Sequence, residues 1–151
     1  MGMHYTGTRR EQRALDTFVK LLRASSAVNA RLNRALVCEE GLTESQLGVL
    51  EALYHLGPLP QGQLSAKLLK SGSNLTTVVQ NLERAGLVRR VRDDGDRRVH
   101  VVHLTDAGRR LIRRIFPAHA GRITAAMDAL APSEQRELAR LCRKLGLAAS
   151  A

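Results

Sequence analysis

The sequence contains few aromatic residues, few cysteines and no long apolar run. Two Tyr, two Phe and no Trp occur among 151 residues, which leaves few rings on which unpaired bases could stack. Cys38 and Cys142 can form at most one bridge, so we expect neither a disulfide framework nor a zinc knuckle. No apolar run approaches the roughly 20 residues that span a bilayer, and the polar, arginine-rich segment 1–13 does not resemble a secretory signal. We therefore expect a soluble, cytoplasmic protein with no membrane partner.

The patterns that carry catalysis or bind metals and cofactors are also absent. The five histidines do not show the His-Glu-x-x-His spacing of a zinc enzyme. The sequence has no Gly-x-Ser-x-Gly elbow, no phosphate loop and no Gly-x-Gly-x-x-Gly turn. We expect a protein that is not an enzyme and that holds no metal or cofactor.

The charge of the chain is strongly unbalanced. Lys and Arg number 24 against 14 Asp and Glu, which gives a net charge of +10 and a pI near 10.9. Such a balance points to a polyanionic partner. Because the chain is poor in aromatic residues, double-stranded DNA is favoured over single-stranded nucleic acid.

The middle of the chain predicts a helix-turn-helix. A capping-box pattern that begins at Thr43 opens one helix, which should end at the Gly-Pro pair 57–58. A short helix should then run from Leu59 to Leu69. A further helix is expected from Gly72 to Ala85, with Ser71 as its N-cap.

The segment that follows predicts a β-hairpin. After Gly86 the period changes from helical to extended, and two β-branched runs, 87–91 and 99–104, flank the charged stretch 92–98. A charged hairpin directly after a helix-turn-helix is typical of the wing of a winged helix.

Long helices are predicted toward both ends of the chain. A stripe of apolar residues, interrupted by Ser25 and Asn29, predicts an amphipathic helix before the helix-turn-helix. After the hairpin, Thr105 should cap another helix that bends at Pro117, and a last helix should open at Pro132. These segments carry more apolar surface than a lone winged helix can bury, so we expect them to combine across a two-fold axis.

This order of elements, together with three motifs, resembles the MarR family of bacterial transcription regulators. The first motif is Leu-Glu-Arg-Ala-Gly-Leu-Val at 82–88, which is similar to the exit of the family's recognition helix. The second is Asp-Arg-Arg at 96–98 followed by Leu-Thr-Asp-Ala-Gly at 104–108, which is similar to the family's wing signature. The third is the Leu-Thr-x-x-Gln pattern at 42–46.

The resemblance covers nearly the whole chain and implies its architecture and function. The fold class would be mainly α with a small β-hairpin wing, as one MarR-like domain over 1–151. Residues 42–104 would form the DNA-binding winged helix-turn-helix, and 11–40 and 105–147 the N- and C-terminal dimerisation helices. The protein would act as an effector-responsive repressor that binds an inverted-repeat operator as a homodimer, with a small aromatic or phenolic effector.

The second helix of the helix-turn-helix offers compact polar side chains for DNA recognition. Asn and Gln can pair with adenine, and the methyl group of Thr can contact that of thymine. A residue at the N-terminus of the helix can support a phosphate contact. The alternative is a solvated helix face, against which the adjoining wing and the positive charge argue. The expected contact residues are Ser71, Ser73, Asn74, Thr76, Thr77 and Gln80.

The hairpin tip offers a second contact. We expect Asp96 to hold a guanidinium in a fixed orientation, and Arg97 or Arg98 to enter a narrow minor groove. The alternative is an exposed turn with salt bridges of little energetic value. The family signature favours the functional interpretation.

The sequence also suggests an effector site and a cysteine of interest. Ser25 and Asn29 could line an effector crevice bounded by Tyr54 and His55, or they could form a hydrogen-bonded dimer seam without a ligand. Cys38 stands next to two glutamates, which disfavour a reactive thiolate, so we expect a buried and inert thiol. Because some relatives in the family are redox sensors, a redox switch at Cys38 is the alternative. We expect Cys142 to serve in packing.

A competing hypothesis from another class also explains the fold and the charge. The chain could be a winged-helix interaction module that docks on an acidic protein and never contacts DNA. Sequence-selective and salt-dependent binding to duplex DNA would separate the two functions.

Overall fold

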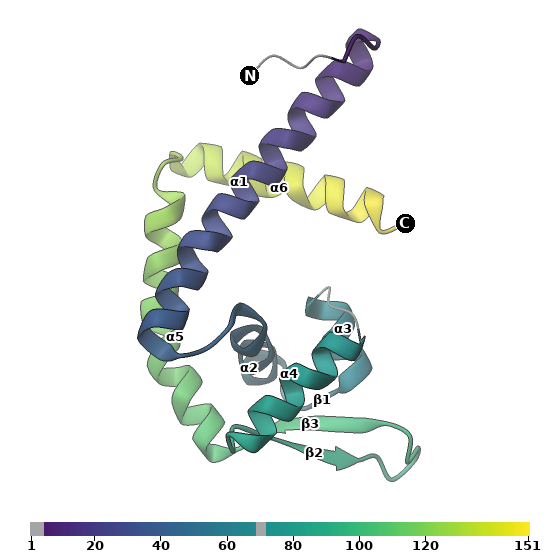
Figure 1. Cartoon of the computed structure of the whole chain (residues 1–151), viewed down its shortest axis with the longest axis vertical. Coiled ribbons are helices and arrows are strands. Elements are labelled where there is room, and N and C mark those ends of the chain that lie inside the picture. The colour runs from purple at the N-terminus through teal and green to yellow at the C-terminus, as the bar shows by residue number, and fades with distance from the viewer. Residues whose placement is uncertain (1–4, 69–71) are drawn as a thin grey trace. The chain divides into compact units, whose positions relative to one another are not determined.

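The computed structural model describes residues 5–68 and 72–151 (Figure 1). These residues form two compact units, the first ending at Thr43 and the second beginning at Glu44. The elements, in chain order, are α1 (Arg9–Glu40), α2 (Glu44–Leu56), β1 (Leu59–Pro60), α3 (Gln61–Leu68), α4 (Gly72–Arg84), β2 (Val88–Arg92), β3 (His100–Leu104), α5 (Asp106–Met127) and α6 (Pro132–Ala149). The mainly helical fold with a small hairpin wing is confirmed. Ser71, the expected cap of α4, lies outside the described residues.

Helix α1 makes up most of the first unit and has a defined cap at each end. At its start, Thr8 Oγ1 accepts a hydrogen bond from the backbone N–H of Glu11, while the Glu11 carboxylate accepts one from the backbone N–H of Thr8. The bond from the Thr8 backbone N–H to the Glu11 carboxylate, and a second bond from the Thr8 hydroxyl to the same carboxylate, lower the pKa of Glu11. At its end, Gly41 adopts a left-handed conformation with φ of 66°, which a residue without a Cβ adopts at little cost. The capping box explains why the helix begins earlier than its apolar stripe.

The core of the second unit is built from aliphatic side chains only. They come from α2, α3, α4, β2, β3 and α5, so the helix-turn-helix, the wing and the start of α5 share one core. The buried residues are Leu47, Val49, Leu50, Leu53, Leu64, Leu75, Val79, Leu82, Val88, Val102, Ile112 and Ile115.

The sheet has three antiparallel strands in the order β1-β3-β2. The wing hairpin pairs Val88 with Leu104 and Arg92 with His100. Strand β1 adds two residues at the other edge of β3, where Leu59 pairs with Val102. We expected Leu59 to open a helix, and that prediction is wrong. Its neighbour Pro60 restricts Leu59 to extended backbone and, having no N–H, suits a sheet edge.

Helix α5 begins on a tightly packed joint with the turn between α4 and β2. Thr105 is the N-cap, as predicted, because its Oγ1 accepts a hydrogen bond of 3.1 Å from the backbone N–H of Gly108. The same hydroxyl donates to the carbonyl of Gly86 at 2.7 Å. A Cβ on Gly108 would lie 2.0 Å from the carbonyl oxygen of Leu87. The Leu-Thr-x-x-Gly motif thus lets the start of α5 pack directly against the backbone of the α4–β2 turn.

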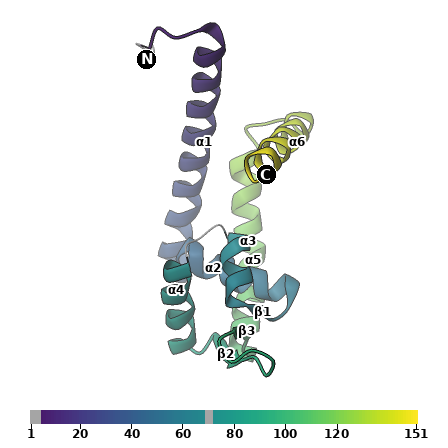
Figure 2. The same ribbon diagram turned by 90° about the vertical axis from the view of Figure 1, so that its right-hand side faces the viewer.

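The last helix carries apolar side chains that the single chain does not cover. Helix α5 includes Pro117, where the expected bend stays a prediction, and α6 then runs across its end (Figures 1 and 2). On α6, Leu138, Leu141 and Leu145 are 38%, 45% and 55% exposed. Among residues 5–68 and 72–151, no helix combines the length and the apolar character that crossing a membrane requires.

Candidate nucleic-acid interface

Helix α4 presents a polar face on the side opposite its buried stripe. Leu75, Val79 and Leu82 are buried, whereas Asn74 and Thr77 are exposed. Thr76 and Gln80 are half-buried, and Ser73 lies in the first turn of the helix. The backbone of α4 therefore brings the predicted contact residues within the described part of the chain onto one short helix.

One residue that the sequence did not single out holds Thr76 in place. Gln61, the first residue of α3, donates a hydrogen bond from Nε2 to Thr76 Oγ1 at 2.8 Å. The bond is partly buried and joins the N-terminus of α3 to the middle of α4. Because the two residues are 15 positions apart, no local pattern reveals this contact.

An ion pair joins α4 to the wing. The Glu83 carboxylate accepts three hydrogen bonds from Arg90: from the backbone N–H at 3.1 Å, from Nε at 3.3 Å and from Nη2 at 3.1 Å. These bonds, those of the side chain first, hold the pKa of Glu83 below its ordinary value. Since Glu83 lies on α4 and Arg90 on β2, the pair fixes the wing relative to the helix.

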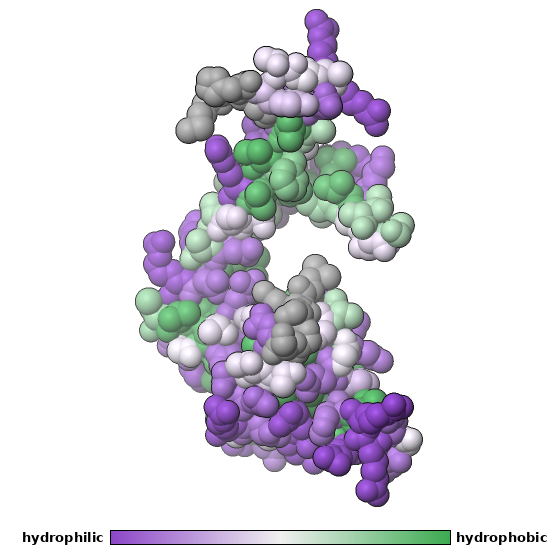
Figure 3. All heavy atoms as spheres, turned by 45° about the vertical axis from the view of Figure 1, so that its right-hand side comes forward, coloured by the Kyte–Doolittle hydropathy of each residue, from purple (hydrophilic) through white to green (hydrophobic). Residues whose placement is uncertain are grey.

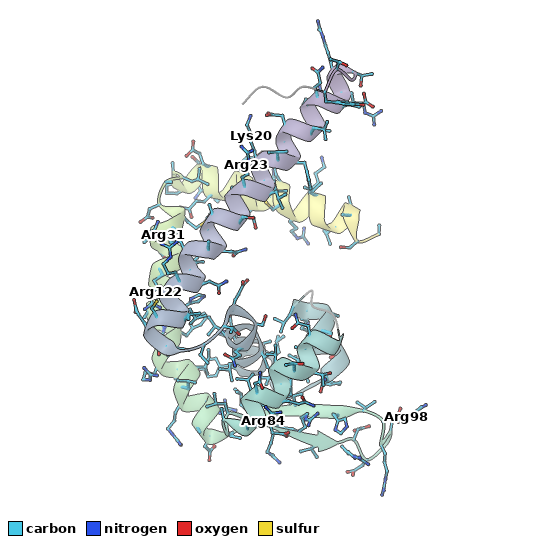
Figure 4. All side chains as sticks on the ribbon, in the orientation of Figure 1. Lys20, Arg23, Arg31, Arg84, Arg98 and Arg122 are labelled. Atoms are coloured by element: carbon cyan, nitrogen blue, oxygen red, sulfur yellow. The ribbon has the colours of Figure 1, made fainter. Side chains whose placement is uncertain are left out.

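The wing tip distinguishes its two arginines. Asp96 accepts hydrogen bonds from the backbone N–H of Arg98 at 3.0 Å and from its Nε at 3.2 Å, and this pairing lowers the pKa of Asp96. The Arg98 side chain stays 91% exposed and lies at the end of the hairpin (Figure 4). Arg97 is exposed and forms no ion pair within the described part of the chain. Hydrophilic side chains cover this end of the molecule (Figure 3).

A groove of about 550 Å³ lies between α3, α4 and the wing. Its lining residues come from α3, from α4, from β2, from the hairpin loop and from the start of β3. They are Gln61, Gly62, Ser65, Thr76, Arg90, Arg98, Val99 and His100. Both residues of the α3–α4 hydrogen bond, and the arginines of the two wing ion pairs, thus line the same groove.

The candidate effector residues occupy different parts of the chain. Tyr54 and His55, at the end of α2, form edge-to-face contacts: the Tyr54 and His55 rings are 5.2 Å apart, and His55 and Phe116 are 5.4 Å apart. Arg113 donates from Nε to the Tyr54 hydroxyl at 3.3 Å. Ser25 and Asn29 are exposed residues of α1. No local sequence pattern connects Phe116 and Arg113 with Tyr54, because they lie about 60 positions away from it.

Both cysteines are exposed. The expectation of a buried Cys38 is wrong, because Cys38 lies on the solvent-facing side of the last turns of α1, next to Val37 at 52% exposure. The expected packing role of Cys142 is also not observed, since α6 has no buried residue in the single chain. Among the described residues, no group of three His, Cys, Asp or Glu side chains is arranged to hold a metal ion.

Helices α2, α3 and α4 are followed by a wing that is joined to α4, and α4 carries a polar face. This arrangement defines a winged helix-turn-helix protein. The model of the MarR family matches residues 40–99. The HTH-type transcriptional regulator YkoM of Bacillus subtilis strain 168 is 36% identical over 136 residues, which cover 90% of this chain and 88% of YkoM. The chain belongs to the MarR family, and its relative YkoM is named as a transcriptional regulator.

Two solved structures resemble the chain over most of its length. Sco3205 of Streptomyces coelicolor, a MarR family regulator in complex with DNA, has a TM-score of 0.82 at 26% identity, covering 97% of this chain and 91% of that chain. BpsR of Bordetella bronchiseptica, whose DNA binding is regulated by 6-hydroxynicotinic acid, has a TM-score of 0.79 at 26% identity, covering 87% and 98%. The chain therefore shares its helices and its wing with a MarR family regulator that was solved in complex with DNA.

Proposed function

We propose that the chain is a homodimeric, effector-responsive transcription repressor that binds an inverted-repeat operator in double-stranded DNA. The observation that carries the proposal is the hydrogen-bonded ion pair that joins α4 to the wing, formed by Glu83 and Arg90. A helix and a hairpin held at a fixed distance can enter a major groove and the adjacent minor groove together. The net charge of +10 supplies the sequence-independent attraction to phosphate.

Within this proposal, α4 lies in the major groove. Asn74, Thr77 and Gln80 contact base edges, and the methyl group of Thr76 contacts thymine while Gln61 holds its hydroxyl. Ser73, in the first turn of the helix, supports a phosphate contact. The same role is proposed for Ser71, which lies outside the described residues. Arg97 enters the minor groove, since it is the arginine of the wing tip that no carboxylate holds within the described residues.

Dimerisation accounts for the exposed apolar side chains of the terminal helices. On α1, Phe18 and Leu22 are 59% and 54% exposed, and on α6 Leu141 and Leu145 are similarly accessible. Apolar residues repeated along a helix face are typical of an interface between copies. A two-fold dimer would present two α4 helices to major grooves about 34 Å apart, so the operator would be an inverted repeat.

The effector site that the contacts favour centres on Tyr54 and His55. Edge-to-face rings, with interplanar angles of 72° and 71°, suit an aromatic ligand. Arg113, 5.9 Å from the centre of the Tyr54 ring, suits an anionic group on that ligand. BpsR, which a small aromatic acid regulates, shares the fold. The polar residues Ser25 and Asn29 of α1 are additional candidates, to be tested by substitution.

A selection of bound sites from random duplex DNA tests the function. The wild-type protein should enrich one inverted repeat, and Thr77→Ala should weaken binding to it by about 1–3 kcal/mol while leaving affinity for random duplex unchanged. Thr124→Ala, which removes an exposed threonine of α5 bonded only to its own helix, is the matched control. Failure to enrich any sequence, together with salt-dependent binding to an acidic protein, would favour the interaction module instead.

A further inference from the structure

The polar side chains of α4 are short and uncharged. Between Gly72 and Glu83 the sequence has neither Lys nor Arg, and the polar positions hold Ser, Asn, Thr and Gln. This part of the helix therefore lacks the long cationic side chains that pair with guanine. A short side chain reaches only the base edge directly opposite it, so the direction in which it points decides what it can recognise.

A threonine in a helix has two directions open to it. Its hydroxyl can bond to a backbone carbonyl three or four residues earlier, and for this reason threonine divides between two χ1 rotamers where valine and isoleucine strongly prefer one. The hydroxyl and the γ-methyl group share one Cβ, so each rotamer sends the methyl group in a different direction. With both rotamers populated, Thr76 would present its methyl group to a given base for only part of the time.

The contact with Gln61 selects between these directions. Nε2 of Gln61 donates to Oγ1 of Thr76 at 2.8 Å, and the bond is partly buried. It directs the hydroxyl toward the N-terminus of α3, which at the same time fixes the direction of the methyl group. A hydrogen bond of ordinary strength favours the bonded rotamer by about fivefold.

The donor of this bond is itself held in place. Gln61 follows directly on β1, where Pro60 has a restricted φ and pairs with Val101 of β3. Three residues further on, Leu64 is fully buried and anchors the first turn of α3 in the core. The Gln61 side chain is half-buried and lines the same groove as Thr76. The edge of the sheet thus determines where the amide meets α4.

We infer that Gln61 is a positioning residue for sequence recognition, which acts through Thr76 and makes its γ-methyl group select thymine at one position of each half-site. The inference rests on the proposed function and assigns part of the operator sequence to a residue outside the helix that contacts the bases. The selected pair is A·T, since thymine is the base that displays a methyl group in the major groove. Gln61 itself contacts no base in this assignment.

Duplexes in which one thymine is replaced by deoxyuridine test the contact, because the replacement removes only the methyl group. With the full-length wild-type protein and its selected duplex, affinity should fall about fourfold at one thymine of a half-site, as expected for one buried methyl group. Thr76→Ser, which keeps the hydroxyl and removes the methyl group, should bind both duplexes equally at that position.

The same duplexes measure the role of Gln61. Gln61→Met keeps the length of the side chain and removes the donor, so the difference between thymine and deoxyuridine should shrink to less than about twofold as the second rotamer becomes populated. In the double variant Gln61→Met/Thr76→Ser the difference should be absent, as in Thr76→Ser alone. Gln63→Met, which replaces an exposed glutamine of the same helix, is the matched control and should keep the full difference.

The rotamer can also be measured without DNA. Three-bond NMR couplings to the γ-methyl carbon of Thr76 report its χ1 angle, which should correspond to one staggered rotamer in the wild type and to an average in Gln61→Met. Gln61→Ala, which also removes the donor, gives a second variant, and thermal unfolding of each variant checks its fold. An averaged χ1 in the wild type, or a single rotamer that persists in both variants, would overturn the inference.

Failure of the inference differs from failure of the proposed function. A protein that enriches one inverted repeat, but responds to deoxyuridine at no position or equally in wild type and Gln61→Met, would keep the proposed function and overturn the inference. A protein that enriches no duplex sequence would contradict the proposed function and the inference with it, even if the Thr76 rotamer depended on Gln61.

Discussion

Glu83 positions the wing relative to α4, the two elements of the candidate DNA interface, without having to contact DNA itself. It binds the backbone and the guanidinium of Arg90 at once, so it fixes both the path of β2 and the direction of the arginine. The Glu83 and Arg90 side chains are 38% and 25% exposed, which leaves the pair partly screened by solvent. Its contribution to global stability should therefore be about 1 kcal/mol or less.

We predict that Glu83→Gln loosens the wing more than it destabilises the fold. Amide hydrogen exchange of β2 should accelerate in the variant, since the bond to the Arg90 backbone weakens. Glu137→Gln, which breaks a comparable pair with Arg140 inside α6, is the control and should leave the exchange of β2 unchanged. Equal exchange in wild type and Glu83→Gln would show that the strand ladder alone holds the wing.

The same pair has a predictable pH dependence. Because the pKa of Glu83 is lowered in the folded state, its stabilising effect is fully present above the ordinary Glu pKa and is lost as the pH falls through the lowered value. The difference in unfolding free energy between wild type and Glu83→Gln should thus disappear in acid. Urea denaturation of both proteins at neutral and acidic pH measures it, and a difference that grows in acid would contradict the assignment.

At the scale of elements, the joint between the α4–β2 turn and α5 depends on a residue without a side chain. A Cβ at Gly108 would overlap the Leu87 carbonyl oxygen, so Gly108→Ala should force the backbones apart and cost about 2 kcal/mol or more. Gly121→Ala is the matched control, because it lies on the same helix and its Cβ would meet no atom within 4 Å. The control should be neutral or slightly stabilising. Urea denaturation compares the two, and equal stabilities would show that the joint can relax.

Elements defined by local patterns were predictable from the sequence, and contacts between elements were not. The Thr105 cap, the helix-ending Gly86 and the two β-branched strands of the wing each depend on a few neighbouring residues, and the structure confirms them. Strand β1 escaped prediction because its two residues pair with β3 across more than 40 positions. The bond from Gln61 to Thr76 escaped for the same reason: only tertiary packing brings an amide on one helix to a hydroxyl on the next.

At the scale of the whole molecule, the exposed leucines of α6 raise the question of what covers them. The sequence indicated apolar residues on α6 but could not say what covers them, and the single chain leaves every residue of that helix partly or fully accessible. Leu138, Leu141 and Leu145 follow one another at spacings of three and four, so they share one face of the helix. Because these leucines are already about half buried, covering the rest of each side chain would contribute roughly 0.7–1.5 kcal/mol.

We predict that replacing Leu141 and Leu145 with Gln separates the dimer. The two substitutions act in both protomers, so the dimer dissociation constant should rise by about 100-fold or more. Arg136→Gln, on the opposite side of α6, provides the control and should leave the constant unchanged. Sedimentation equilibrium measures the association. Affinity for the inverted repeat should fall in parallel toward that for a single half-site, because the second α4 is no longer held in place. A double variant that remains dimeric and binds the inverted repeat as wild type would place the interface outside this face of α6.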